Sequence, residues 1–483
     1  MNIAASRLIL PLPRPQYIRV PEGFITSLAW REYRLLGGSS NGTSTQLTLG
    51  TTGEIKGKVI FRATSNTSKA KSPLQTTAPV TDDAIAAFGA ALKRRGFQSA
   101  EEDHTIGESI VHAISGVSAA KGMGQAASPM TPSLAMLQNV AGVHAVLRPP
   151  NLGKTIELIR SMGAAANSSA TASASWARAV EHRSSFDPLL RIIDAAVSDV
   201  ILPGSRVRKG ASTDTNEFND WSGLFPNSPF SWFDSMWTRL TRPDWVSRLP
   251  ARVWTDWATT VLRLAFGGAY LWEAAWYESM ARVIIGQQDP TWINVRSQMP
   301  SPLPWHAASE SISVRDLAPV LMWRVHRAAQ IMREIATWLE QDRGPLSADD
   351  ALKAMRRDDV LRKALVRALG SKRKISSGNN TWEAIKYALK VRESFGEFAD
   401  HYGLLAQNHR YLTVEPRTEW VAVIASLSCP KPGGETDVGR VLSGLDDLGI
   451  RPGLADFVRL LEKAGLARGS ADADQGVIVQ SAF

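Results

Sequence analysis

The sequence has almost no cysteine, and it has no apolar N-terminal segment of the length a secretory signal needs. Cys429 is the single cysteine in 483 residues, which excludes an intramolecular disulfide and any multi-cysteine zinc or iron–sulfur site. Only the six residues LILPLP follow Arg7 as an apolar segment. These absences suit a reducing compartment, and the expected location is the cytoplasm.

Recognisable catalytic and metal-binding patterns are also lacking. None of the eight histidines has the spacing that would point two imidazoles of one helix at a metal ion. The Gly-Lys-Thr at 153–155 is no phosphate loop, because Arg148 stands where such a loop requires a glycine. We therefore expect no cofactor, no metal and no catalytic residue.

One alternative would make the protein an enzyme. Glu54 and Lys56 form the Glu-x-Lys half of a metal-dependent nuclease site, in which a carboxylate holds the metal and the lysine polarises the attacking water. Upstream of them only Glu22 and Glu32 could supply a further carboxylate. A nuclease or other hydrolase whose site is assembled from distant residues stays open as an alternative.

The composition is that of a globular protein with an excess of basic residues. Hydrophobic residues make up 44% and charged residues 21% of the chain, and its length predicts two to four domains. The net charge of +9 points to a polyanionic partner such as nucleic acid or anionic lipid. The position of this charge in the chain is therefore more informative than its sum.

The N-terminal region, residues 1–78, is expected to contain β-structure. The segments 45–50 and 57–64 alternate apolar and polar side chains around a glycine-containing turn, as in a hairpin. The segment 65–79 has the composition of a linker or loop. A helical domain is expected at 79–205, beginning with a helix at 81–96 whose acidic first turn and basic last turn suit the helix dipole.

A tryptophan-rich helical domain is expected at 215–410, because residues 221–338 hold 12 of the 16 tryptophans. Amphipathic patterns and helix breakers predict further helices over the chain at 153–163, 187–202, 314–344, 347–370 and 381–403.

The stretch 250–278 carries four tryptophans, two tyrosines and the pair Gly267-Gly268. Charges at Arg263 and Glu273 leave only nine clean apolar residues between them, too few for a membrane span. The pattern predicts a buried helix, with the glycine pair allowing another backbone to approach closely. A stacking platform for bases and a membrane-surface helix are the weaker alternatives. The stripe that faces the core comprises Trp254, Ala258, Val261, Ala265, Trp272, Trp276 and Met280.

The C-terminal region, residues 415–483, has the pattern of a separate module. A possible first helix at 417–427 precedes a helix that ends near Gly449, an amphipathic helix and two strands. This helix–turn–helix followed by a hairpin resembles a winged-helix module. Residues 435–483 hold five basic and eight acidic side chains, so this module is expected to dock a protein and not DNA.

The strongest functional feature is a basic segment with +7 net charge over 353–374. On a helix and the loop after it, such residues suit a phosphate backbone. An acidic protein surface and plain solvation are the alternatives. The candidate nucleic-acid-binding residues are Lys353, Arg356, Arg357, Arg362, Lys363, Arg367, Lys372, Arg373 and Lys374.

Together these patterns predict a mainly α, multi-domain protein with a β-containing N-terminal region, a Trp-rich central helical domain and a C-terminal winged-helix-like module. The expected function is a non-catalytic, nucleic-acid-associated subunit of a larger bacterial DNA-processing or phage-defence assembly. DNA is favoured over RNA as the partner, partner protein subunits are expected, and a membrane is not. A purely structural scaffold that binds acidic proteins is a second alternative.

Overall fold

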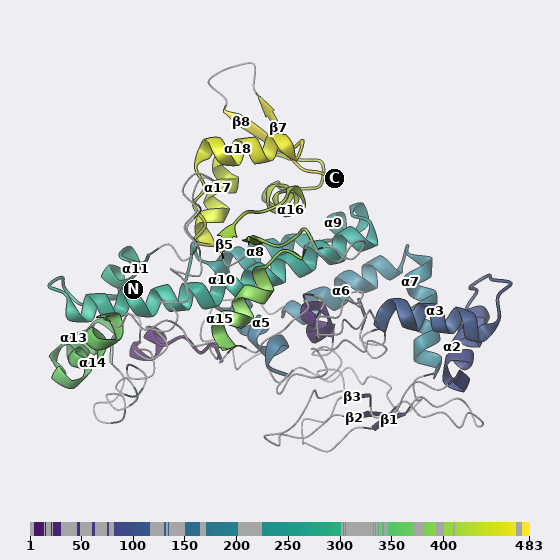
Figure 1. The fold of residues 1–483 in the computed structure, drawn as a ribbon, viewed down its shortest axis with the longest axis horizontal. Helices are drawn as coiled ribbons and strands as arrows, with labels where there is room; N and C mark the ends of the chain where they lie inside the picture. Colours follow the sequence, from purple (N-terminus) through teal and green to yellow (C-terminus); the bar gives the residue numbers. More distant parts are fainter. Residues whose placement is uncertain are drawn as a thin grey trace. The chain divides into compact units, whose positions relative to one another are not determined.

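In the residues that it describes, a computed structural model is mostly helical, with three small sheets (Figure 1). The structure describes residues 4–13, 15, 21, 23–29, 46–48, 60–62, 75–76, 82–115, 130–131, 134, 150–164, 171–200, 225–300, 303, 305, 332, 334, 337, 341, 346–370, 380–392, 400–408, 411–469 and 476–483.

The first group of helices precedes the tryptophan-rich region and comprises η1 (Ala5–Leu8), α2 (Asp82–Arg94), α3 (Asp103–Ser115), α5 (Pro150–Gly163), α6 (Ala172–Ser184) and α7 (Pro188–Val200). The central group comprises α8 (Pro229–Leu240), α9 (Pro243–Arg248), α10 (Ala251–Ile285) and α11 (Trp292–Ser297). The last group comprises α13 (Ala348–Arg357), α14 (Asp359–Gly370), α15 (Asn380–Leu389), α16 (Thr418–Ser428), α17 (Val438–Asp447) and α18 (Leu454–Lys463).

The strands form three separate antiparallel sheets. Their order is β1-β2-β3 in the first sheet, β4-β5 in the second and β6-β8-β7 in the third. The strands are β1 (Gln46–Thr48), β2 (Ile60–Arg62), β3 (Gln75–Thr76), β4 (Leu405–Asn408), β5 (Tyr411–Val414), β6 (Glu435–Asp437), β7 (Ala467–Gly469) and β8 (Val477–Gln480).

The first sheet confirms the hairpin expected near the N-terminus. β1 pairs with β2 so that Gln46 lies opposite Arg62 and Thr48 opposite Ile60. β3, which the sequence pattern placed in a linker or loop, adds a third strand by pairing with β2. The linker or loop interpretation of 65–79 is therefore wrong at Gln75–Thr76.

The chain divides into two compact units, each made of several segments. The first comprises Met1–Arg14, Trp221–Phe233 and Leu264–Ala482, and the second Pro15–Asp220, Asp234–Arg263 and Phe483. Helix α10 contributes its first part to the second unit and the rest to the first. The four regions expected from the sequence stay a prediction.

The tryptophan-rich stretch forms α10 and lies in the core, as predicted. All seven residues of the predicted stripe are buried, and so are Tyr270, Leu271 and Ala274 on the other sides of the helix. Trp254 stacks on Trp176 in the second unit, with ring centroids 4.3 Å apart. Residues 257–272 are all buried, the charged Arg263 among them, so the middle of α10 lies inside the protein. None of the helices in the described part of the chain is long and apolar enough to cross a membrane.

In the first unit, α10 also holds the N-terminal segment in place. The Trp276 indole donates a hydrogen bond to the Leu8 carbonyl (2.9 Å), and the Tyr270 hydroxyl donates to the Pro13 carbonyl (2.6 Å). The buried aromatic side chains thus satisfy their own polar atoms while they bind an extended segment.

Gly267 and Gly268 allow close packing, but the neighbours are side chains and not the backbone that we expected. A Cβ on Gly267 would lie 2.8 Å from the Leu389 side chain, and one on Gly268 would lie 3.2 Å from Pro229. A glycine in a helix costs about 1 kcal/mol, and here the cost is offset by packing against α15 and the start of α8.

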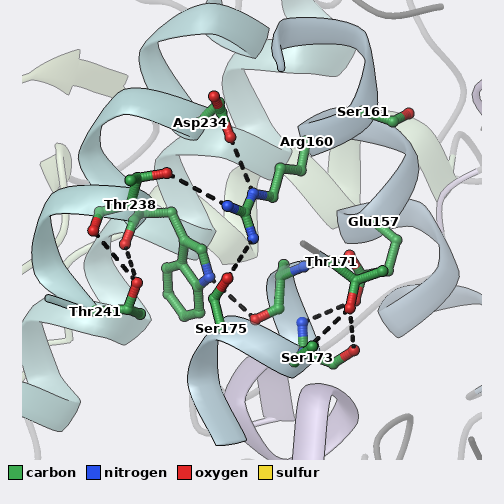
Figure 2. A network of polar contacts seen from close by, with 12 residues as sticks. Glu157, Arg160, Ser161, Thr171, Ser173, Ser175, Asp234, Thr238 and Thr241 are labelled. Atoms are coloured by element: carbon green, nitrogen blue, oxygen red, sulfur yellow. Dashed lines mark hydrogen bonds and ion pairs between the residues drawn. The ribbon is translucent and has the colours of Figure 1, made fainter. Parts of the chain in front are cut away.

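A buried polar network joins α5, α6 and α8 in the second unit (Figure 2). The Arg160 guanidinium donates to Asp234 (3.0 Å), Ser175 (2.8 Å) and Thr238 (3.3 Å). The Glu157 carboxylate accepts from the Ala172 and Ser173 amides at the start of α6. Side chains of these types also occur in catalytic clusters, but here their hydrogen bonds connect three helices.

Two predicted helices are shorter than the sequence pattern suggested, one because it ends early and one because it is interrupted. The helix expected at 381–403 ends at Leu389, after which the Val391 amide donates to the carbonyl of Leu405, the first residue of β4. The helix expected at 347–370 is interrupted at Asp358. The helix expected at 314–344 lies almost entirely outside the described residues.

Candidate nucleic-acid interface

Six of the nine predicted phosphate-binding residues lie on α13 and α14, two successive short helices (Figure 1). The other three, at 372–374, lie outside the described residues. Ser347 begins α13 as its N-cap, and its hydroxyl accepts a hydrogen bond from the Asp350 amide (3.2 Å).

Asp358 separates the two helices. Its backbone is extended, with φ −83° and ψ 106°, and its carboxylate accepts from the Leu361 amide (2.8 Å). An aspartate in this position caps the following helix and prevents continuation of the previous one. The Asp358-Asp359 pair was the sequence signal for this break, and the prediction of one continuous helix is wrong here.

Each helix buries one apolar ridge. On α13 the ridge is Ala351, Leu352 and Met355, and on α14 it is Leu361, Leu365 and Ala368. The spacing of three and four residues places each set on a single side of its helix. The basic side chains therefore have to lie on the remaining surface.

Arg356 has a structural role that its sequence position did not indicate. Its guanidinium donates to the carbonyls of Val283 (2.6 Å), Ile284 (3.3 Å) and Gln288. These carbonyls lie at the end of α10 and just beyond it, where helical partners are missing and positive charge is favoured. Arg356 therefore caps α10 through its Nε and Nη2 groups, which these carbonyls occupy.

The other five basic side chains, namely Lys353, Arg357, Arg362, Lys363 and Arg367, are exposed. Lys353 lies 3.9 Å from Asp350 and Arg362 lies 3.9 Å from Asp359, and exposed pairs of this kind contribute little. Residues 348–370 hold six basic and four acidic side chains, so their net charge of +2 is well below the +7 of 353–374. The described surface is thus a local group of cations and not a strongly charged face.

Two exposed valines lie among these cations on α14. Val360 is 80% exposed and Val366 is 55% exposed. Sequence reasoning missed them because each fits an apolar helical pattern, and only burial shows which apolar residues form the ridge. The outer face of α14 therefore combines positive charge with methyl groups.

The alternative nuclease residues, Glu54 and Lys56, lie outside the described residues. Within the described part of the chain, no group of three or more His, Cys, Asp or Glu side chains could hold a metal ion.

The C-terminal part of the first unit consists of α16, β6, α17, α18, β7 and β8 in chain order (Figure 1). Helices α16, α17 and α18 surround buried side chains that include Trp420, Val441 and Phe457. Trp305 packs edge-on against Phe457, and Trp232 of α8 lies beside Gly444. One side of this region is therefore covered by other parts of the same unit.

Asp447, the last residue of α17, is partly buried in this region. Desolvation and the neighbouring Asp446 carboxylate raise the pKa of Asp447 to about 6, against the opposing effect of Arg296. The carboxylate thus carries its charge at neutral pH at a cost in folding free energy.

Replacing Asp447 by asparagine is expected to stabilise the protein at neutral pH. Between the ordinary value of 3.8 and about 6, the folded chain holds a proton that the unfolded chain has lost, so stability falls as the pH rises through this range. Allowing for solvent screening, we expect a gain of about 1 kcal/mol at about pH 7.5 and almost none at about pH 3.5. Thermal unfolding of both proteins at the two pH values measures this, with the exposed Glu462→Gln variant as control. An equal gain at both pH values would contradict the assignment.

The chain was compared with protein families, curated proteins and solved structures. Neither a family model, nor a curated protein, nor a solved structure matches the chain.

Proposed function

We propose that the chain is a non-catalytic, nucleic-acid-associated subunit of a larger bacterial DNA-processing or phage-defence assembly. Arg362, Lys363 and Arg367 of α14 contact the phosphate backbone, with Lys353 and Arg357 of α13 beside them. The observation that carries the proposal is the exposure of these five cations on two adjacent helices whose apolar ridges are buried. Phosphate contacts by Lys and Arg supply most of the affinity for nucleic acid.

We also propose that the C-terminal region is a winged-helix module that docks a partner protein. The order helix, strand, two helices and two strands, with β8 between β6 and β7, is that of a winged helix. Its exposed cations are partly neutralised, since Arg451 pairs with Asp446 and Arg459 lies 3.4 Å from Asp456. A surface with this charge balance suits a protein partner better than a phosphate backbone.

Reversing the charges of α14 tests the phosphate contact. The variant Arg362→Glu, Lys363→Glu and Arg367→Glu is expected to bind nucleic acid about 100-fold more weakly at low salt, with a smaller dependence of affinity on salt. Fluorescence anisotropy with duplex DNA, single-stranded DNA and RNA probes over a salt series measures both quantities. The side chains are exposed, so circular dichroism and thermal unfolding should show an intact fold.

A matched control reverses three exposed cations of the C-terminal module, namely Arg440, Arg459 and Lys463. This variant has the same net charge change but should lose much less affinity. Equal losses in the two variants would show that only total charge matters and would contradict the placement on α14. If the unchanged protein bound no nucleic acid at low salt, but α14 reversal released an acidic protein that co-purifies with it, the scaffold alternative would replace the proposal.

A further inference from the structure

We propose that α14 is a recognition helix that lies in the major groove of double-stranded DNA, with Val360 and Val366 against thymine methyl groups. This inference rests on the proposed function and adds the class of nucleic acid and the way it is bound. It starts from the two exposed valines, which a simple phosphate-binding surface leaves unexplained.

The exposed residues of α14 form one continuous face. Leu361, Leu365 and Ala368 are buried, and the exposed positions fall within about half of the helix circumference on the opposite side. Two rows of side chains run along this face, and we call them ridges. One consists of Val360, Lys363 and Arg367 at spacings of three and four. The other consists of Asp359, Arg362 and Val366 at the same spacings, with Asp359 lying 3.9 Å from Arg362.

Each ridge therefore mixes methyl groups with cations. Single exposed apolar residues are common on protein surfaces and need no explanation. Here both highly exposed valines lie on the same 12-residue helix, and each is next to a cation on its own ridge. A valine cannot bind a phosphate, so a ligand that uses the whole face must offer apolar groups between its negative charges.

Duplex DNA offers this combination in its major groove. The groove admits an α-helix, displays the thymine methyl group, and presents guanine acceptors to Arg and Lys, with phosphates along both edges. Double-stranded RNA has a major groove that is too narrow for side chains to read. Single strands are bound chiefly by stacking on aromatic side chains, and α14 has none. The face thus fits B-form DNA best.

Uracil substitution tests the methyl contact without changing any protein atom. An A/T-rich duplex and the same duplex with uracil in place of thymine differ only in the thymine methyl groups. The unchanged protein is expected to bind the uracil duplex about 3- to 10-fold more weakly, and double-stranded RNA at least about 10-fold more weakly. The variant Val360→Ala and Val366→Ala should bind the two DNA duplexes equally well.

The control variant is Leu189→Ala, which shortens a comparably exposed side chain on α7 (52% exposed) and should keep the preference for thymine. If the unchanged protein bound both duplexes equally, or bound double-stranded RNA as well as DNA, the recognition-helix inference would be wrong. Loss of binding on charge reversal of α14 would then still support the proposed function. Absence of all nucleic-acid binding would overturn both.

Discussion

Replacing Gly89 by alanine is expected to destabilise the second unit by about 3–5 kcal/mol, because the new methyl group would collide with the backbone of α3. A Cβ on Gly89 would lie 1.7 Å from the Asp103 carbonyl oxygen and 2.5 Å from its carbonyl carbon. Backbone atoms cannot rotate away as a flexible side chain can. The two helices would have to separate, and the apolar contacts between them would be lost.

Gly107 makes the reciprocal contact and should show a comparable effect. A Cβ at this position would lie 2.2 Å from the Ile85 carbonyl oxygen in α2. Each helix thus presents a glycine to the backbone of the other, which allows an unusually close crossing. Either substitution alone should be sufficient to break it, so the double variant should cost little more than each single one.

Hydrogen exchange and thermal unfolding together measure this effect and its location. We expect lower protection of the α2 and α3 amides in Gly89→Ala, in addition to a lower melting temperature. Gly370→Ala is the matched control, because nothing lies within 4 Å of a Cβ at that position and its effect should be below about 1 kcal/mol. Equal stability of Gly89→Ala and Gly370→Ala would contradict the close crossing.

The crossing of α2 and α3 also shows which features the sequence could predict and which it could not. A helix at 81–96 was predicted from its acidic first turn, its basic last turn and the glycine that follows, and α2 spans Asp82–Arg94, with Gly96 at φ +100°. These signals are local in sequence. Gly89 disfavours a helix, and its presence could have indicated a packing requirement. Its partner could not be predicted, because the contact joins residues whose pairing depends on the tertiary fold.

In the candidate site, too, the sequence predicts local features but not the contacts that depend on the tertiary fold. The cations of 353–374 were found from composition alone, and exposure of five of them agrees with the expected solvent-facing side of a helix. The capping role of Arg356 was not predictable, since its acceptors lie about 70 residues away in the chain at the end of α10. The exposure of Val360 and Val366 was missed for the same reason, because burial is a property of the whole fold.

Replacing Arg160 by leucine is the second substitution for which we expect a large loss of stability. The Arg160 side chain is 5% exposed and binds Asp234, which is 22% exposed, together with Ser175 and Thr238 (Figure 2). Leucine fills part of the space but leaves the Asp234 carboxylate without its counter-ion and two hydroxyl groups without a donor. Removing one partner of a buried pair costs about 3–5 kcal/mol.

A double-mutant cycle separates the charge pair from the packing. Asp234→Leu alone leaves the guanidinium buried beside Ser175 and Thr238 and should also destabilise the protein, whereas Arg160→Leu with Asp234→Leu should recover part of the loss. Chemical denaturation of the four proteins gives the coupling free energy, which we expect to be about 2 kcal/mol. The control pair is Arg252 and Asp256, whose side chains are 78% and 24% exposed and lie 2.8 Å apart. Its coupling should not exceed about 0.5 kcal/mol.

The outcome of this cycle would also show whether the ion pair contributes more to stability than apolar side chains of the same size. A buried ion pair is often no more stabilising than apolar residues of the same size, so recovery in the double variant is expected if the pair only joins helices. Ser175 lies on α6, while Asp234 and Thr238 lie one turn apart on α8, so the planar guanidinium fixes the register of both helices against α5. A lysine cannot match three acceptors in this geometry, and Arg160→Lys should therefore lose most of the same stability even though it keeps the charge. If lysine restored full stability, Coulombic attraction alone would account for the pair, and the proposed role of the guanidinium in setting helix register would be wrong.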